Sequence, residues 1–284
     1  MMRPAFLTLV ALATALSTSL PARAGDRILS IGGSVTEIIY ALGAEDRLIA
    51  RDRTSIYPDA ALKLPEVGYM RALAPEGVLS VNPDLIISEA GAGPLETLEV
   101  LKTADIPFVE VSDAYTGAGI LDKITTVGQA VDRAAEAAAL VETVRSGLDE
   151  VADKVATIDE AERKRVMFIL STQGGRIMAS GTGTAAAGII SMAGGINALS
   201  EFEGYKLVTD EAVSNAAPDV ILMMDRGGDH GAPTVDLLAM PALVTTPAAE
   251  TGSVVRMNGL YLLGFGPRTA GAALELAQAL YGAL

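Results

Sequence analysis

The sequence predicts an α/β protein of two Rossmann-like lobes with mostly parallel sheets, joined by one long, rigid α-helix. Short β-branched runs alternate with helical patterns along the chain, which is typical of parallel sheets with helices on both faces. The segment Glu76-Gly-Val-Leu-Ser-Val-Asn-Pro83-Asp84 is echoed by Glu211-Ala-Val-Ser-Asn-Ala-Ala-Pro218-Asp219. Such an echo indicates two similar lobes, although helix–Pro-Asp–strand is also a common α/β joint. A proline-free stretch between the two copies predicts the joining helix.

The N-terminus has the features of a cleavable export signal. Arg3 supplies a positive charge, residues 5–20 are almost wholly apolar or small, and Ala22-Arg23-Ala24 is a small-x-small cleavage site. The apolar run is short for a membrane span. We therefore assign residues 1–24 to a signal peptide and expect the mature protein to begin at Gly25.

Composition excludes several classes of function. The formal net charge of −14 repels phosphate backbones, so nucleic acid is not an expected partner. The chain has no cysteine, which excludes disulfides and thiolate metal sites. Only 4% of the residues are aromatic, so each tyrosine carries more information than usual.

Residues 25–133 are predicted to form the first lobe. Ser34 is expected to cap its first helix, with Glu37 completing a capping box. The preceding Gly32-Gly33-Ser34 lacks the full spacing of a nucleotide fingerprint, so we predict a tight turn whose backbone amides face a cleft. The predicted strands span 27–31, 48–51, 85–88 and 107–111, and the predicted helices span 35–42, 75–82 and 95–103.

Residues 134–158 are predicted to form the joining helix, which is too long for an ordinary sheet-covering helix. A coiled coil is the other interpretation, but the apolar positions do not hold a strict heptad. Residues 159–284 are predicted to form the second lobe. Its strands are expected at 166–170, 220–224 and 254–257, and its helices at 184–193 and 269–281.

The chain resembles the substrate-binding proteins of bacterial ABC importers that have a single rigid interlobe helix and serve haem, cobalamin and iron–siderophores. The resemblance is strongest to the haem-binding branch. The segments that carry it are Gly68-Tyr69-Met-Arg71, Gly181-Thr-Gly-Thr-Ala-Ala, Ala193-Gly-Gly-Ile-Asn197 and Leu262-Leu-Gly-Phe-Gly-Pro-Arg268. It implies a class III periplasmic-binding-protein fold, a periplasmic location, haem as transported ligand, an ABC permease and ATPase as partners, and a monomer.

The resemblance also implies roles for particular residues. Tyr69 would be the axial ligand of the haem iron, and Arg71 would support its phenolate by hydrogen bonding. Arg226 is the candidate for a haem contact from the second lobe. Some relatives place a histidine after the strand 166–170, where this chain has Ser171-Thr172-Gln173, so a second axial ligand from that position is not expected.

The chemistry of these residues is consistent with that assignment. Tyrosinate is one of the known axial ligands of haem iron, and a nearby guanidinium stabilises the phenolate. In an extended segment, Arg71 would point to the same side as Tyr69. His230 is the only histidine and could supply a second ligand, but an exposed loop histidine without a partner is the favoured interpretation.

Glu76 and Glu211 occupy matching positions of the echo. In the wider importer class, glutamates at the tips of both lobes meet arginines of the permease, which suggests a docking role; the alternative is that they only stabilise helix N-termini. The sequence thus predicts a haem-binding protein rather than an enzyme. A siderophore or cobalamin binder is the first alternative, and an exported haem-handling enzyme is the second.

Overall fold

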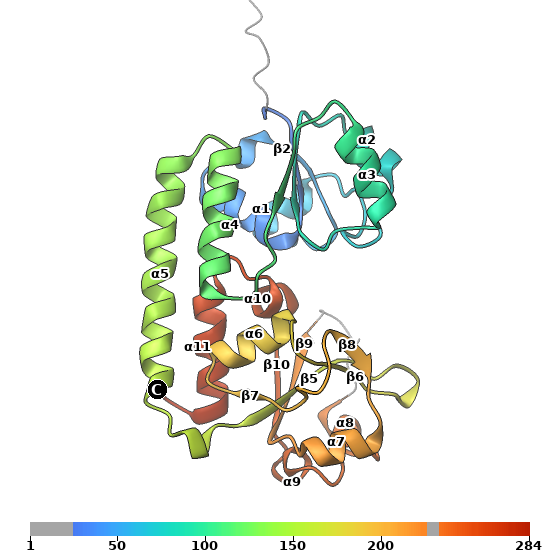
Figure 1. Cartoon of the computed structure of the whole chain (residues 1–284), viewed down its shortest axis with the longest axis vertical. Helices are drawn as coiled ribbons and strands as arrows, with labels where there is room; N and C mark the ends of the chain where they lie inside the picture. The colour runs from blue at the N-terminus through green and yellow to red at the C-terminus, as the bar shows by residue number, and fades with distance from the viewer. Residues whose placement is uncertain (1–24, 226–232) are drawn as a thin grey trace, which may run out of the picture.

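A computed structural model describes residues 25–225 and 233–284, which form two α/β lobes beside one long helix (Figure 1). The N-lobe contains sheet A, a parallel four-stranded sheet in the order β2-β1-β3-β4. Its strands are β1 (Ile28–Ile31), β2 (Leu48–Arg51), β3 (Leu85–Glu89) and β4 (Phe108–Val111). Its helices are α1 (Gly33–Ala41), α2 (Pro75–Ser80), α3 (Leu95–Thr103) and α4 (Gly117–Ala130).

The C-lobe contains sheet B, which is mixed. The strand order is β10-β9-β5-β6-β8, with β7 also paired to β5. These strands are β5 (Arg165–Ser171), β6 (Met178–Ser180), β7 (Ile196–Asn197), β8 (Tyr205–Leu207), β9 (Val220–Asp225) and β10 (Val254–Asn258). Its helices are α6 (Ala185–Met192), α7 (Asp210–Ala216), α8 (Thr234–Leu238), α9 (Pro247–Thr251), α10 (Gly259–Leu263) and α11 (Thr269–Tyr281).

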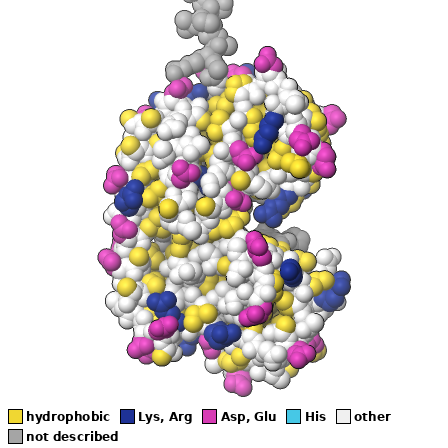
Figure 2. Space-filling model, in the orientation of Figure 1, with side chains coloured by type: hydrophobic (Ala, Val, Ile, Leu, Met, Phe, Trp, Pro, Cys, Tyr) yellow, Lys and Arg dark blue, Asp and Glu magenta, His cyan; other side chains and the backbone are white. Residues whose placement is uncertain are grey.

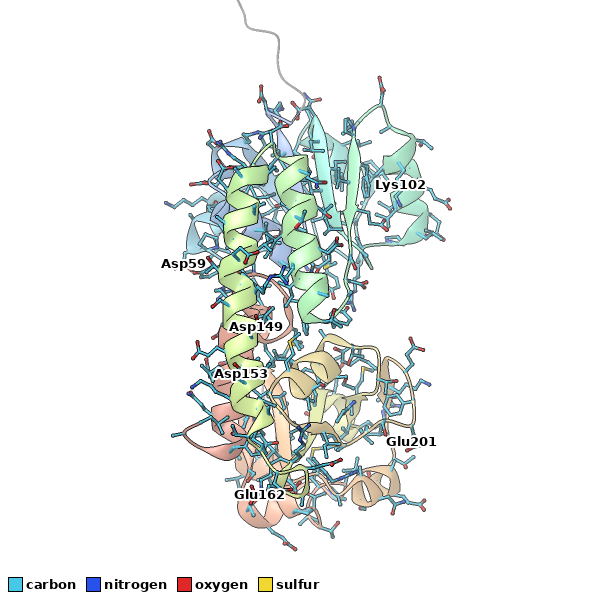
Figure 3. The ribbon with its side chains drawn as sticks, turned by 60° about the vertical axis from the view of Figure 1, so that its left-hand side comes forward. Asp59, Lys102, Asp149, Asp153, Glu162 and Glu201 are labelled. Carbon is cyan, nitrogen blue, oxygen red and sulfur yellow. The ribbon has the colours of Figure 1, made fainter. Side chains whose placement is uncertain are left out.

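The predicted joining helix is α5 (Ala134–Ala156), which has 23 residues and runs alongside both lobes. In Figure 3, Asp149 labels the part of α5 that lies level with the gap between the lobes. The helix packs on α4 of the N-lobe and α11 of the C-lobe. A Cβ atom on Gly147 would lie 3.1 Å from the Cβ atom of Ala270, so glycine lets α5 approach α11 closely. Within residues 25–225 and 233–284, no helix is both long and apolar enough to cross a membrane.

The sequence echo corresponds to a repeated three-dimensional joint. In the N-lobe, the Asp84 carboxylate accepts a hydrogen bond from the Arg27 amide at 2.9 Å, and the Arg27 guanidinium donates to the Asn82 carbonyl at 2.8 Å. In the C-lobe, Asp219 accepts from the Arg165 amide at 2.8 Å, and the Arg165 guanidinium donates to the Ala216 carbonyl at 2.9 Å. The same helix–Pro-Asp–strand joint, tied to the same type of arginine, therefore occurs once in each lobe.

One hydrophobic core runs through both lobes. A single cluster of buried side chains includes Ile28 and Val35 of the N-lobe together with Phe168 and Leu222 of the C-lobe. The buried face of α5, which includes Val144 and Val151, belongs to the same cluster. The lobes are thus connected by continuous packing and not only by the chain that passes between them.

Two local predictions were wrong. Gly32 caps α1 without a side-chain hydrogen bond, and the predicted cap Ser34 instead donates its hydroxyl to Glu89 at 2.9 Å. The predicted capping-box partner Glu37 binds Arg268 of the C-lobe. Tertiary contacts replace the predicted cap: Ser34 is bound to β3 of the same lobe, and Glu37 is bound to the other lobe.

The tight turn before α1 is present, but its surroundings differ from the prediction. A Cβ atom on Gly33 would lie 2.4 Å from Cδ1 of Leu260 in α10. The glycine is therefore required by the close approach of the C-lobe. An apolar side chain of the C-lobe covers this turn.

Candidate functional site: the cleft between the lobes

The two lobes face each other across a cleft, which Figure 2 shows as a hollow in the right-hand side of the molecule. The carboxyl end of β10 leads into α10, whose Leu260 contacts Gly33 just beyond β1. Because parallel strands end at the same edge of a sheet, the loops that follow β1, β2, β3 and β4 lie on the side of sheet A that faces the C-lobe. Ligand sites of open α/β sheets form at such edges.

Tyr69 lies on a turn at this edge. Gly68 precedes it with φ of 112°, a conformation that favours glycine, and the Ala72 amide closes the turn on the Tyr69 carbonyl at 2.7 Å. The turn is held between two loops, since the Arg53 backbone amide donates to the Gly68 carbonyl and the Gly93 backbone amide donates to the Met70 carbonyl. The segment is thus a turn, and the prediction that an extended segment aligns Tyr69 with Arg71 was wrong.

The Tyr69 side chain is 39% exposed. Within the described part of the chain, its hydroxyl has no hydrogen-bond partner. Arg71, two residues further on, is also exposed, and among the described residues no carboxylate forms an ion pair with it. A phenol and a guanidinium are therefore both available to a ligand at this edge of the N-lobe.

Arg71 is close to two further tyrosines that the sequence analysis did not single out. Its charge acts on Tyr115, in the loop between β4 and α4, and on Tyr205, at the start of β8 in the C-lobe. Tyr205 also raises the pKa of Tyr115, so a side chain of the C-lobe and Arg71 of the N-lobe act on the same phenol. In the sequence, only the scarcity of aromatic residues could have pointed to Tyr115 and Tyr205 as site residues.

The pKa values of Tyr115 and Tyr205 are both raised. Burial raises the pKa of Tyr115, and the Asp113 carboxylate raises this pKa further, against the opposing charge of Arg71. Burial also raises the pKa of Tyr205, against the opposing effects of hydrogen bonds to Thr184 and the Ala186 backbone and of the Arg71 charge. Both phenols are half-buried, whereas Tyr69 is among the exposed large side chains.

A buried ion pair underlies the N-lobe side of the cleft. Lys123 of α4 is fully buried and pairs with Glu89 at the end of β3. The Lys123 ammonium also donates to the Ser34 hydroxyl at 3.0 Å. Buried charges are stable only when paired and hydrogen-bonded, so this cluster fixes α1, β3 and α4 relative to one another beneath the cleft.

A second buried carboxylate shapes the loop that follows β2. Asp52 is completely buried and accepts hydrogen bonds from the Gly32 amide at 3.0 Å and the Ser55 hydroxyl at 2.7 Å. Its other oxygen accepts from both the amide and the hydroxyl of Thr54, each at 2.8 Å. This network holds the loop that carries Tyr57, whose ring contacts Arg268 of the C-lobe.

The other predicted site residues lie elsewhere or outside the described structure. Arg226 and His230 lie outside the described residues 25–225 and 233–284. Glu76 and Glu211 are exposed in the first turns of α2 and α7, the helices of the repeated joint. Within the described residues, no three His, Cys, Asp or Glu side chains cluster as a metal site.

Comparison with known proteins identifies the family. Residues 28–259 match the model of the periplasmic binding protein family, and the chain belongs to that family. A solved structure of the periplasmic haem-binding protein BhuT in complex with two haems is similar at a TM-score of 0.85 and 38% identity. The similarity covers 89% of this chain and 97% of BhuT.

Two curated relatives show the breadth of the family. The vitamin B12-binding protein of Yersinia pseudotuberculosis is 28% identical over 97% of this chain and 92% of its own length. The uncharacterised ABC transporter substrate-binding lipoprotein YvrC of Bacillus subtilis is 30% identical over 70% of this chain, and this chain spans only 63% of its length. These relatives are binding proteins of transport systems, and the structure and family together define a substrate-binding protein of the haem, cobalamin and siderophore class.

Proposed function

We propose that the protein captures ferric haem between its lobes, with the phenolate of Tyr69 bound to the iron, and delivers it to an ABC importer. The observation that carries this proposal is the contrast between the cleft tyrosines. Tyr115 and Tyr205 are half-buried, and burial raises the pKa of both phenols, whereas Tyr69 is 39% exposed and its hydroxyl has no partner among the described residues. The similarity to BhuT supports haem as the ligand.

Arg71 favours the charged form of Tyr69 in this proposal. A guanidinium near a phenolate stabilises it by charge and hydrogen bonding, and Arg71 lacks a carboxylate partner in the described structure. Haem also carries carboxylates, which a free guanidinium can bind. Arg226 is proposed as a second haem contact and His230 as a lesser candidate for a second iron ligand, both from the segment outside the described residues.

The test is an absorption titration of the mature protein with ferric haem. The variant Tyr69→Phe removes only the phenol oxygen, and Tyr115→Phe is a matched control in the same cleft. We expect a high-spin tyrosinate charge-transfer band in the wild type and in Tyr115→Phe, and its loss in Tyr69→Phe. Unchanged binding in Tyr69→Phe would move the iron ligand elsewhere, with His230→Ala as the next variant.

Cobalamin is the second candidate because a vitamin B12-binding protein matches nearly the whole chain. The same titration with cyanocobalamin separates the two ligands. Saturable binding of cobalamin without saturable binding of haem would replace the haem proposal. If the corrin does not contact the Tyr69 phenol, the affinity for cobalamin should be the same in Tyr69→Phe as in the wild type.

We further propose that Glu76 and Glu211 dock the loaded protein on the permease, and that residues 1–24 direct export to the periplasm. Both glutamates are exposed at matching sites of the two lobes. Charge reversal at both positions is expected to abolish transport into vesicles that contain the importer while haem binding in solution stays unchanged. Transport at the wild-type rate would remove the docking role.

A further inference from the structure

A segment of the C-lobe, Gly259 to Arg268, is inserted against the N-lobe. It begins with α10, which lies at the waist of the molecule between the two lobes (Figure 1). Leu260 fills the space above Gly33, as described above. Phe265 is 1% exposed, and its ring meets the Tyr115 ring edge-on with the centroids 5.2 Å apart. The segment therefore contacts both α1 and the β4–α4 loop.

Arg268 ends this segment and forms an ion pair across the lobes. Its Nε donates to Oε1 of Glu37 at 3.0 Å, and its Nη2 donates to Oε2 at 2.8 Å. The Glu37 side chain is 7% exposed and the Arg268 side chain is 30% exposed. A bidentate pair with a buried carboxylate fixes both the distance and the orientation of its partners.

Two tyrosines enclose the guanidinium. Arg268 lies 3.5 Å from the ring centroid of Tyr57 in the N-lobe and 5.2 Å from that of Tyr261 in α10. Such cation–π contacts add to the attraction and shield the ion pair from water. The arginine is thus held by a carboxylate and an aromatic ring of the N-lobe while its backbone belongs to the C-lobe.

A second close contact lies across the same interface. A Cβ atom on Gly188 of α6 would lie 2.6 Å from the Tyr115 carbonyl oxygen and 2.9 Å from Cζ of Phe265. Only glycine permits this approach. The two lobes are therefore in direct contact at Gly33, at Gly188 and at the Glu37–Arg268 pair.

We propose that Glu37 and Arg268, with Phe265, form an interlobe lock that sets the width of the cleft before any ligand binds. Rotation of one lobe about α5 would separate a buried carboxylate from its only ion-pair partner in the described structure and would open the contacts at both glycines. Removing one member of such a pair leaves an uncompensated charge. The lock therefore opposes both opening and closing of the cleft.

The lock does not depend on which ligand the cleft takes, so it can be tested without one. The chain has no cysteine, and Ser80 of α2 and Ser214 of α7 are exposed, one in each lobe. Spin labels on the double variant Ser80→Cys/Ser214→Cys would report the distance between the lobes by pulsed electron resonance. We expect one narrow distance distribution for the ligand-free protein with an intact lock.

Three lock variants are compared in the labelled background. Arg268→Ala removes the guanidinium, Glu37→Gln retains the shape of the side chain but not its charge, and Arg268→Lys retains the charge but not the two-pronged geometry. We expect Arg268→Ala and Glu37→Gln to broaden or shift the distribution, and Arg268→Lys to restore part of the narrow peak. The variant Lys102→Ala breaks an exposed ion pair with Glu110 inside the N-lobe and should leave the distribution unchanged.

The lock proposal is overturned if Arg268→Ala and Glu37→Gln both keep the parent's interlobe distance distribution, with the same width and the same centre. Circular dichroism of each variant establishes that it is folded, and Glu37→Gln remains informative if Arg268→Ala does not fold. Haem or cobalamin titrations of the same samples are a separate readout. The lock can thus stand when the haem proposal fails, and the reverse also holds.

Discussion

The two lobes are alike at the repeated joint and unlike at the cleft. Each lobe has a short helix, a Pro-Asp pair and a strand tied to an arginine by equivalent hydrogen bonds. At the cleft, sheet A is fully parallel and supports a turn with Tyr69. Sheet B instead adds two antiparallel strands, β6 and β8, and Tyr205 lies on β8. Under the proposed function, the matching joints would meet the permease and the dissimilar cleft walls would bind the ligand.

The largest expected effect concerns the buried charges beneath the N-lobe side of the cleft. Glu89→Ala leaves Lys123 buried without its carboxylate, which should lower the free energy of unfolding by about 3–5 kcal/mol. Glu110→Ala, which breaks the exposed pair with Lys102, should cost less than about 1 kcal/mol. Urea denaturation measures both. Equal losses of unfolding free energy in the two variants would mean that the buried ion pair stabilises the N-lobe no more than the exposed ion pair does.

The next effect compares the two cleft walls. Under the proposed function, Arg71→Gln should weaken ferric haem binding by about 10–100-fold, the usual effect of losing an outer partner of a metal ligand. Tyr205→Phe should leave the affinity unchanged, because the Tyr205 hydroxyl is already bonded within the C-lobe. Equilibrium titration with haem tests the pair. An equal loss from Tyr205→Phe would make the C-lobe wall an equal contributor to binding.

The repeated joints should respond alike. Asp84→Ala and Asp219→Ala each remove a carboxylate that accepts a backbone amide at the start of a sheet strand. Each should lower the free energy of unfolding by about 1.5 kcal/mol, the lower range for hydrogen bonds to charged groups. Thermal denaturation compares the two variants. A loss confined to one lobe would show that the joints are similar in geometry but not in energy.

The smallest effect is a dependence of stability on alkaline pH. The pKa values of Tyr115 and Tyr205 are raised in the folded protein, so the unfolded chain releases these protons first as the pH rises. Their contribution should be constant below about pH 10, the ordinary tyrosine value, and should fall above it. Urea denaturation between pH 8 and 11 should show this decline, and a double Tyr115→Phe/Tyr205→Phe variant should show less of it.

Sequence periodicity predicted most of the regular structure. The helices α3 and α11 begin and end where expected, and the predicted strands of sheet A match closely, because long amphipathic helices and β-branched runs report burial directly. The strands β6 and β8 have three residues each and are too short for a periodic pattern. The joining helix was predicted to begin at residue 134, as α5 does, but the 14-residue helix α4 before it was not predicted.

The site was less predictable for a different physical reason. Local rules assigned Ser34 and Glu37 to a helix cap, but their partners Glu89 and Arg268 lie far away in the sequence. No local pattern reports a partner separated by 231 residues. Tyr115 and Tyr205 are likewise brought together only by the approach of the two lobes. Tyr69 and Arg71 were found by resemblance to a family motif, and whether they bind haem stays a prediction.

The long reach of the Glu37–Arg268 pair also constrains how the chain is made. A ribosome must add 231 residues after Glu37 before Arg268 exists to pair with it, and Gly33 is likewise made long before the α10 residue that covers it. In an N-terminal fragment that stops before residue 259, Glu37 therefore lacks its partner Arg268, and the turn at Gly33 is not covered by Leu260. The N-lobe is synthesised first, but its contacts are completed only after the C-lobe residues Leu260 and Arg268 have been made.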